Sequence, residues 1–164
     1  MNNYQSVVRA IAFFAIVNCQ LLIVYCASAQ TDFKQQYSIS KRLFTDAKYN
    51  LAMESFKKLI PYDQNNPYTE YASFYYAVSA YHQGYLSVSK DMFNQIKTLY
   101  PTWDRLDEVN IWLAKIHFDN KDYFQGLRLL GSVTNAKAKK EIVPMKKQAI
   151  SSVQDVETLR MMLE

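Results

Sequence analysis

The sequence predicts an all-α protein in which three helical hairpins stack as an α-solenoid and a C-terminal helix caps the stack. Three stretches share one pattern, "AKYNLAMESF" from residue 47, "GYLSVSKDMF" from residue 84 and "KDYFQGLRLL" from residue 121, so that successive starts are 37 residues apart. The whole chain contains only three glycines and four prolines, which suits long helices better than a β-sandwich with its many turns. A pattern that returns at a fixed period indicates one structural unit used three times.

Residues 1–29 have the composition of a secretory signal peptide. One positive side chain, Arg9, precedes a long apolar run, and "ASA" supplies small residues before the expected cleavage between Ala29 and Gln30. The alternative is a retained membrane anchor, because the apolar run is long for a signal peptide. Both cysteines, Cys19 and Cys26, lie in this segment, so the mature chain would have no disulfide and no cysteine-based metal site. We therefore expect export across the inner membrane.

The remaining part, residues 30–164, is long enough for one modest domain. Of the 19 basic side chains only Arg9 precedes it, so 18 basic side chains face 15 acidic ones, a net charge of +3. This excess is too small to indicate nucleic-acid binding. One basic patch, at 137–147, predicts a solvated face and could also meet an acidic partner or anionic lipid headgroups. Its members are Lys137, Lys139, Lys140, Lys146 and Lys147.

Apolar residues recur at three- and four-residue spacing in each expected helix of residues 30–136, as in "YNLAMESFKKLI", "SVSKDMFNQIKTLYP" and "EVNIWLAKIHF". Pro101 is expected to stop the second of these helices. Before the third, Asp104 reads as an N-cap residue and Asp107 as part of an acidic first turn. These stripes predict helices that bury one side.

Aligned at 37 residues, the three copies keep small and large side chains in the same places. The small positions are Ser40, Ala77 and Ala114 in the first helix and Ala52, Ser89 and Gly126 in the second; the large ones are Phe56, Phe93 and Leu130. A small residue lets two backbones approach, and a large one fills the space beside it. Each copy therefore reads as a helix–turn–helix unit.

This register resembles the tetratricopeptide repeat, a unit of about 34 residues, here with about three extra loop residues per copy. The small first-helix position of that family matches all three copies, and its small-then-aromatic pair matches Ala52 with Phe56 and Ser89 with Phe93. The family's early tryptophan is absent from all three copies. The resemblance covers roughly residues 33–136.

In stacked repeats of this family, the first helices line a concave groove. The resemblance therefore implies a partner-binding surface formed by Tyr37, Lys41, Tyr71, Phe74, Tyr75, Val78, His82, Trp112 and Lys115. Aromatic side chains beside a few lysines suit the anchoring of a peptide. The alternative is that part of this stripe is core or lies under the C-terminal helix.

Residues 137–164 depart from the register and predict a basic linker followed by a helix, with Pro144 between them. The expected apolar stripe of this helix is Ile150, Val153, Val156, Leu159 and Leu163. Such a helix would cap the open end of the array. Alternatively it begins a fourth unit, and the natural chain continues beyond Glu164.

No motif predicts catalysis, a cofactor or a metal. His82 and His117 lack metal-binding spacing, and no glycine-rich phosphate loop is present. The carboxylates of the third unit read as helix caps and turn residues; they are Asp104, Asp107, Glu108, Asp119 and Asp122.

We therefore expect a non-enzymatic scaffold or adaptor of the bacterial cell envelope, periplasmic or associated with the outer membrane. It resembles the repeat proteins of envelope assembly, which implies a protein or peptide partner and no nucleic acid. Membrane contact is expected only through partners or the basic patch 137–147. The alternative is an accessory repeat domain of a longer envelope receptor or hydrolase.

Overall fold

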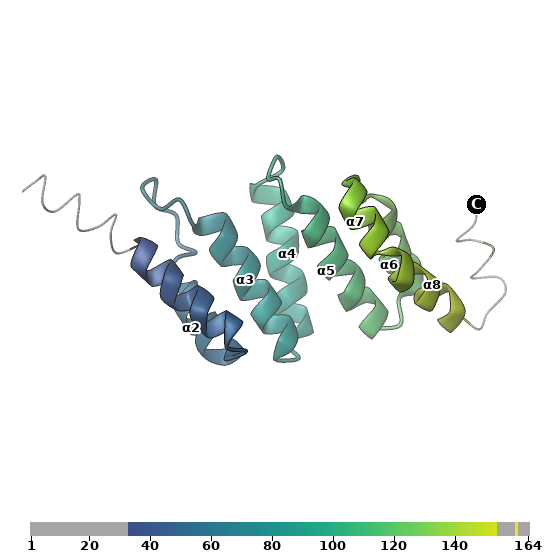
Figure 1. The fold of residues 1–164 in the computed structure, drawn as a ribbon, viewed down its shortest axis with the longest axis horizontal. Coiled ribbons are helices and arrows are strands. Elements are labelled where there is room, and N and C mark those ends of the chain that lie inside the picture. Colours follow the sequence, from purple (N-terminus) through teal and green to yellow (C-terminus); the bar gives the residue numbers. More distant parts are fainter. Residues whose placement is uncertain (1–32, 154–159, 161–164) are drawn as a thin grey trace, which may run out of the picture.

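The computed structural model describes residues 33–153 and residue 160, and all regular secondary structure in this part is helical (Figure 1). This confirms the prediction of an all-α protein. The expected signal peptide, with its cleavage site before Gln30, lies outside the described residues, as do Val156, Leu159 and Leu163. None of the helices in the described part is long and apolar enough to cross a membrane.

The described chain runs through successive helices joined by short turns or loops. A first helical segment covers residues 33–45. It is followed by α2 (Tyr49–Lys57), α3 (Thr69–His82), α4 (Leu86–Leu99), α5 (Leu106–Asp119), α6 (Tyr123–Gly131), α7 (Ala136–Glu141) and α8 (Val143–Ser152).

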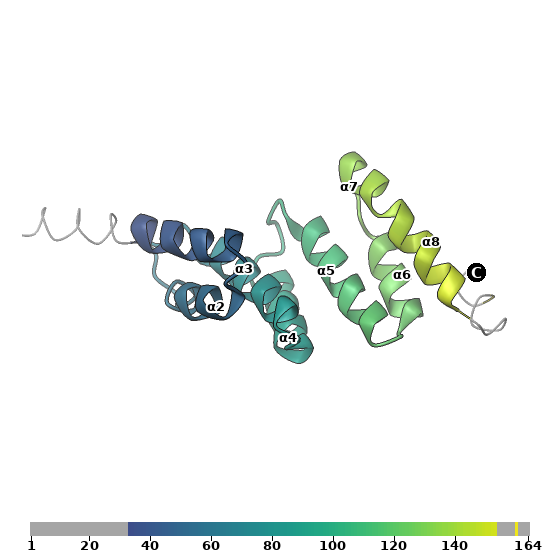
Figure 2. The same ribbon diagram turned by 60° about the horizontal axis from the view of Figure 1, so that its bottom comes forward.

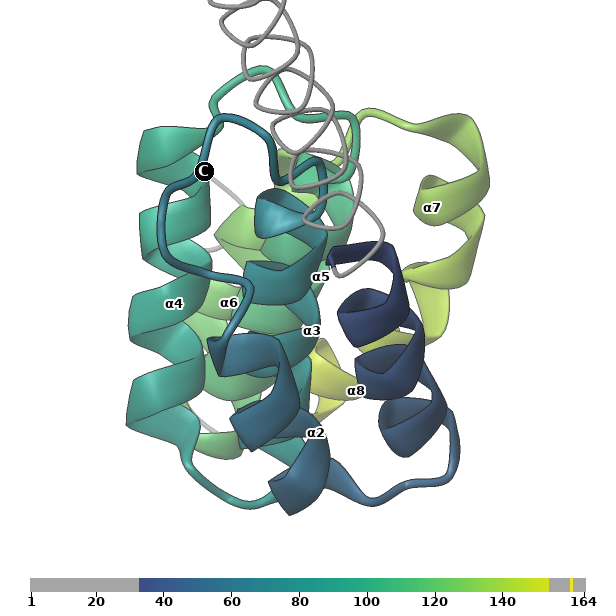
Figure 3. The same cartoon turned by 90° about the vertical axis from the view of Figure 1, so that its left-hand side faces the viewer.

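The helices lie in a row, and most pack mainly against their neighbours in sequence, whereas α8 packs on α6 as well as on α7 (Figures 1 and 2). The most extensive contacts join α3 to α4, α2 to α3 and α5 to α6. Seen from the N-terminal end, α4 lies on one side of the row and α7 on the other (Figure 3). Because the helices pack along one direction, the surfaces at the sides and at the ends of the row are not covered by other described helices.

The three turns within the hairpins share one backbone geometry. In each, the second residue after the first helix has a positive φ: 56° at Ala47, 77° at Gly84 and 61° at Lys121. The next amide reaches back to a carbonyl in the last turn of the helix, with N···O distances of 2.9, 2.9 and 2.8 Å for Lys48 to Leu43, Tyr85 to Ala80 and Asp122 to His117. This arrangement satisfies carbonyls that the helix end would leave unpaired.

The small positions aligned by the 37-residue register, and the large position of the second helix, have the same burial, whereas the aligned Ile39 and Leu113 differ, at 39% and 2% exposed. Ser40, Ala77 and Ala114 are 0% exposed, as are Ala52, Ser89, Phe56 and Phe93, and Leu130 is 1% exposed. At the third copy of one small position stands Gly126, because a Cβ there would collide with the ring of Phe118. The resulting core is divided into three apolar clusters along the row.

The prediction that Asp104 caps a helix is wrong. α5 begins at Leu106, and its N-cap residue, Arg105, makes no capping bond through its side chain. Asp107 accepts hydrogen bonds from the backbone amides of Thr134 (3.0 Å) and Asn135 (2.7 Å). Burial alone would raise the pKa of Asp107, but these hydrogen bonds lower it. The carboxylate thus ties α5 to the loop before α7.

Pro144 lies in the first turn of α8, and the residues before it, which were predicted to be a basic linker, form the short helix α7. Of the predicted apolar stripe, Ile150 is 46% exposed, so its prediction as a packed residue is wrong, whereas Val153, just after the end of α8, is half-buried. The packed side of α8 instead holds Met145 and the buried Ala149, next to the buried Ile142 before the helix. Contact with α6 has therefore selected another side of the helix.

Candidate partner-binding cleft

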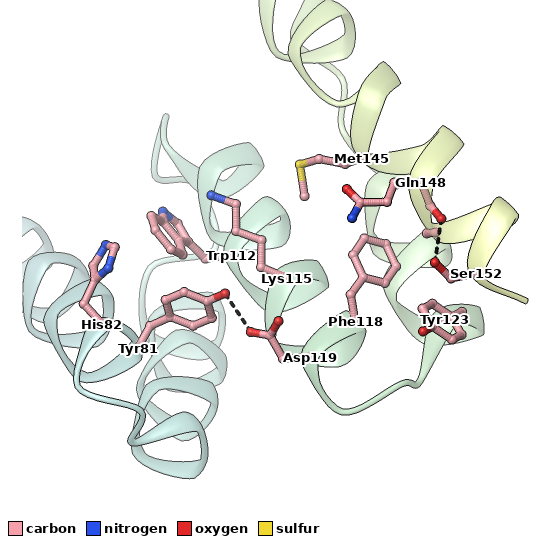
Figure 4. Close-up of a pocket in the computed structure, with 11 residues that line it drawn as sticks. Tyr81, His82, Trp112, Lys115, Phe118, Asp119, Tyr123, Met145, Gln148 and Ser152 are labelled. Carbon is pink, nitrogen blue, oxygen red and sulfur yellow. Dashed lines mark hydrogen bonds between the residues drawn. The ribbon is translucent and has the colours of Figure 1, made fainter.

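A cleft of about 430 Å³ lies between α5 and α8, next to the C-terminal end of α3 (Figure 4). It is lined by Tyr81 and His82 of α3, Trp112, Lys115, Phe118 and Asp119 of α5, Tyr123 of α6, and Met145, Gln148, Ala149 and Ser152 of α8. We call this space the cleft.

The spacing of residues on α5 places its cleft residues on one side of the helix. Trp112, Lys115 and Asp119 follow one another at three- and four-residue intervals and thus share a side. Leu113 and Ile116, between them in sequence, are buried in the core that α5 shares with α3 and α4. Burial of the apolar side therefore turns the mixed side toward the cleft.

Lys115 is the cation of the cleft, and it makes no ion pair with any described residue. Its Nζ lies 3.9 Å from the centroid of the Trp112 ring, a favourable cation–π distance. The side chain is half-buried, and burial lowers the pKa of Lys115, an effect that the charge of Asp119 partly offsets. A half-buried ammonium without an anionic partner favours a ligand that supplies one.

Asp119 is engaged by a different neighbour. The phenol of Tyr81 donates a hydrogen bond to Asp119 Oδ2 across 2.6 Å, joining α3 to α5 at one end of the cleft (Figure 4). Burial and this bond raise the pKa of Tyr81 to about 12. The tyrosine therefore stays protonated at neutral pH and keeps donating to the carboxylate.

His82 contributes a neutral aromatic ring at neutral pH. It stacks on Tyr49, with centroids 4.3 Å apart, and meets the edge of Trp112 at 5.7 Å. Burial and the nearby charge of Lys115 both lower the pKa of His82 below its ordinary value. In the described part of the chain, no group of three or more acidic or histidine side chains could hold a metal ion.

Three of the nine residues predicted to bind a partner meet in the cleft: His82, Trp112 and Lys115. Two others, Phe74 and Val78, are each only 2% exposed and belong to the core, so their prediction as groove residues is corrected. Phe74 packs edge-on against Phe93, with centroids 5.8 Å apart. Phe74, which the family resemblance assigned to the groove, therefore packs against α4 in the core.

The other four predicted residues, Tyr37, Lys41, Tyr71 and Tyr75, are half-buried outside the cleft. Tyr37 stacks on Tyr68 with centroids 4.5 Å apart. Lys41 Nζ lies 3.5 Å from the centroid of Tyr75. Burial would raise the pKa of Tyr75, but hydrogen bonds from Lys41 and Arg105 lower it. These side chains already have partners within the protein.

The wall that α8 contributes was missing from the predicted residues, although cover by the C-terminal helix was an open alternative. Met145, Gln148, Ala149 and Ser152 follow one another at intervals of three, one and three residues, a spacing that places them on one side of a helix. That spacing is the signal in the sequence; nothing in the sequence says which side turns toward α5.

No protein-family model matches this chain, and no curated protein is significantly similar to it. The function is therefore argued from the geometry of the cleft.

Proposed function

We propose that this protein is an exported, non-catalytic adaptor built from tetratricopeptide-like repeats, and that it binds an extended segment of a partner protein in the cleft. The repeat interpretation is supported by the spacing of the elements. Helices α3 and α5 start 37 residues apart, at Thr69 and Leu106, and α2, α4 and α6 start at the same interval, at Tyr49, Leu86 and Tyr123. The shared turn geometry and the equal burial of the aligned small residues support it further.

The observation that carries the binding proposal is the state of Lys115. Its ammonium group is half-buried against Trp112 and has no ion pair in the described part of the chain, while Tyr81 engages the nearest acid, Asp119. A carboxylate of a partner would pair with Lys115, and a neighbouring apolar side chain would contact Phe118 and Met145. A hydrogen bond to a charged group contributes roughly 1.5–3 kcal/mol, enough to select such a segment.

Photo-crosslinking in intact bacterial cells tests this proposal. A photoreactive amino acid replaces Gln148, an exposed residue of the cleft wall. We expect one dominant crosslinked protein, whose yield falls strongly when Lys115→Gln is added. The matched control is Lys97→Gln, because Lys97 is also half-buried but lies on α4 outside the cleft. Equal loss with both variants, or no effect of Lys115→Gln, would contradict binding in the cleft.

The proposal of export rests on residues 1–29. We expect N-terminal sequencing of the protein recovered from the periplasm or outer membrane to begin at Gln30. A sequence that still contains "LLIVYC" would instead indicate a retained anchor.

A further inference from the structure

Helix α8 begins in register with the first helices of the preceding hairpins. It starts at Val143, 37 residues after α5 starts at Leu106, and α5 starts 37 residues after Thr69 of α3. The residue of α8 that aligns with Ala77 and Ala114 is Ser151. By its starting position and by the small residue at the aligned place, α8 corresponds to the first helix of a hairpin.

In each hairpin, the second helix covers the small residue at this aligned position. Ser40 Oγ donates to Ser55 Oγ at 2.8 Å, and Ser89 Oγ of α4 donates to the carbonyl of Ala77 at 2.8 Å. Ala114 packs in one cluster with Leu130 of α6. Ser40, Ala77 and Ala114 are fully buried as a result, whereas Ser151 is exposed.

The same side of α8 exposes two large apolar residues. Val143 is 60% exposed and Ile150 is 46% exposed. They lie seven residues apart, close to two helical turns, and therefore form one ridge about 10 Å long. We call Val143, Lys147, Ile150 and Ser151 the open face of α8. Helix α8 lies at the far end of the row (Figures 1 and 2), and all four residues of this face are exposed.

Positive charge flanks the ridge. At 100° per residue, Lys146 and Lys147 lie on either side of the line from Val143 to Ile150. Neither lysine makes an ion pair with another described residue, since the described ion pairs all lie elsewhere. A second copy of the chain on this face would bring like charges together, whereas an acidic helix would complement them.

We propose that the open face of α8 docks an acidic amphipathic helix of a partner protein, in the place that α6 takes on α5. The apolar side of that helix would cover Val143 and Ile150, and its carboxylates would meet Lys146 and Lys147. This site is distinct from the cleft, because Met145, Gln148 and Ser152, which line the cleft, lie on the opposite side of α8. It does not depend on the proposed function.

A synthetic helix provides the probe. α4 covers the aligned side of α3 through Ser89, so a fluorescent peptide with the sequence of Leu86–Leu99 in which Lys90 and Lys97 are replaced by Glu has the required apolar side and an acidic charge. Fluorescence anisotropy measures its binding to the full chain. We expect a Kd below about 1 mM, weakened at least tenfold by Ile150→Asp and by Lys147→Glu.

Two controls accompany these variants. Tyr62→Asp changes an apolar residue that is 90% exposed between α2 and α3, and it should leave binding unchanged. The peptide with the unmodified α4 sequence should bind at least tenfold more weakly than the acidic one.

Four outcomes would each overturn the proposal. The first is an absence of binding, and the second is equal binding of the acidic and unmodified peptides. The third is a dimer in sedimentation experiments that Ile150→Asp dissociates, which would make a second copy the occupant. The fourth is binding only after removal of residues 154–164, which would make the chain's own end the occupant.

Discussion

Lys115 and Asp119 lie one turn apart on α5, at a spacing where a lysine and an aspartate often pair. Here Tyr81 takes the carboxylate through a 2.6 Å hydrogen bond, and Trp112 takes the ammonium through its ring. The pair is thereby held apart, and the positive charge stays available to a ligand. The chemistry of the cleft thus depends on the phenol of Tyr81 as much as on Lys115.

Replacing Asp119 by Asn should lower two pKa values at once. The carboxylate raises the pKa of Tyr81 through a hydrogen bond and through its charge, and it raises that of Lys115 through its charge. Asp119→Asn removes these effects, so both groups should lose their protons at lower pH than in the wild type. Ultraviolet titration of tyrosinate and NMR titration of the lysine side chains measure the shifts. A rise in either pKa would contradict the described geometry.

Alkaline pH should destabilise the fold in part through Tyr81. Its pKa is raised from 10.0 to about 12 in the folded protein, mainly by burial. A group with a raised folded-state pKa stabilises fully below its unfolded-state pKa and loses that contribution as pH rises through the folded-state value. We therefore expect Tyr81→Phe to lose less stability than the wild type between pH 10 and about 12 in urea unfolding. Tyr62→Phe, at an exposed tyrosine, should behave as the wild type.

Among the elements, the contact between α5 and α6 depends on a glycine. A Cβ at Gly126 would collide with the ring of Phe118, whereas a Cβ at Gly131 on the same helix would meet nothing within 4 Å. Overpacking of this kind costs roughly 1–3 kcal/mol. We expect Gly126→Ala to lower the free energy of unfolding by that amount and Gly131→Ala not to lower it, both measured in urea.

The smaller side chain of Phe118→Leu should relieve the effect of Gly126→Ala. In a double-mutant cycle, the two changes together should then cost less than the sum of their separate effects. Strict additivity would mean that Phe118 is not what excludes a side chain from position 126.

The 37-residue register predicted which residues are small and buried, because helix pairs impose that requirement on sequence directly. It did not predict that Phe74 is core, since this depends on how closely α4 and α5 approach α3. Nor did it predict the side of α8 that packs, because Ala149 and Ile150 are adjacent and both apolar. Only contact with α6 distinguishes them, and that contact joins residues distant in sequence. The sequence therefore predicted the residues that α5 contributes to the cleft, Trp112 and Lys115, but not those that α8 contributes.

At the scale of the whole molecule, stability should be transmitted only between helices that are in contact, because contacts run along the row. Ala149→Asp places a charge where α8 packs and should detach α8 from α6. Hydrogen exchange should then lose protection in α7 and α8, while α3 and α4 keep theirs. Ile150→Asp, one residue on and 46% exposed, is the matched control and should change no protection. If Ala149→Asp lowered protection equally in all helices, the row would unfold as one cooperative unit.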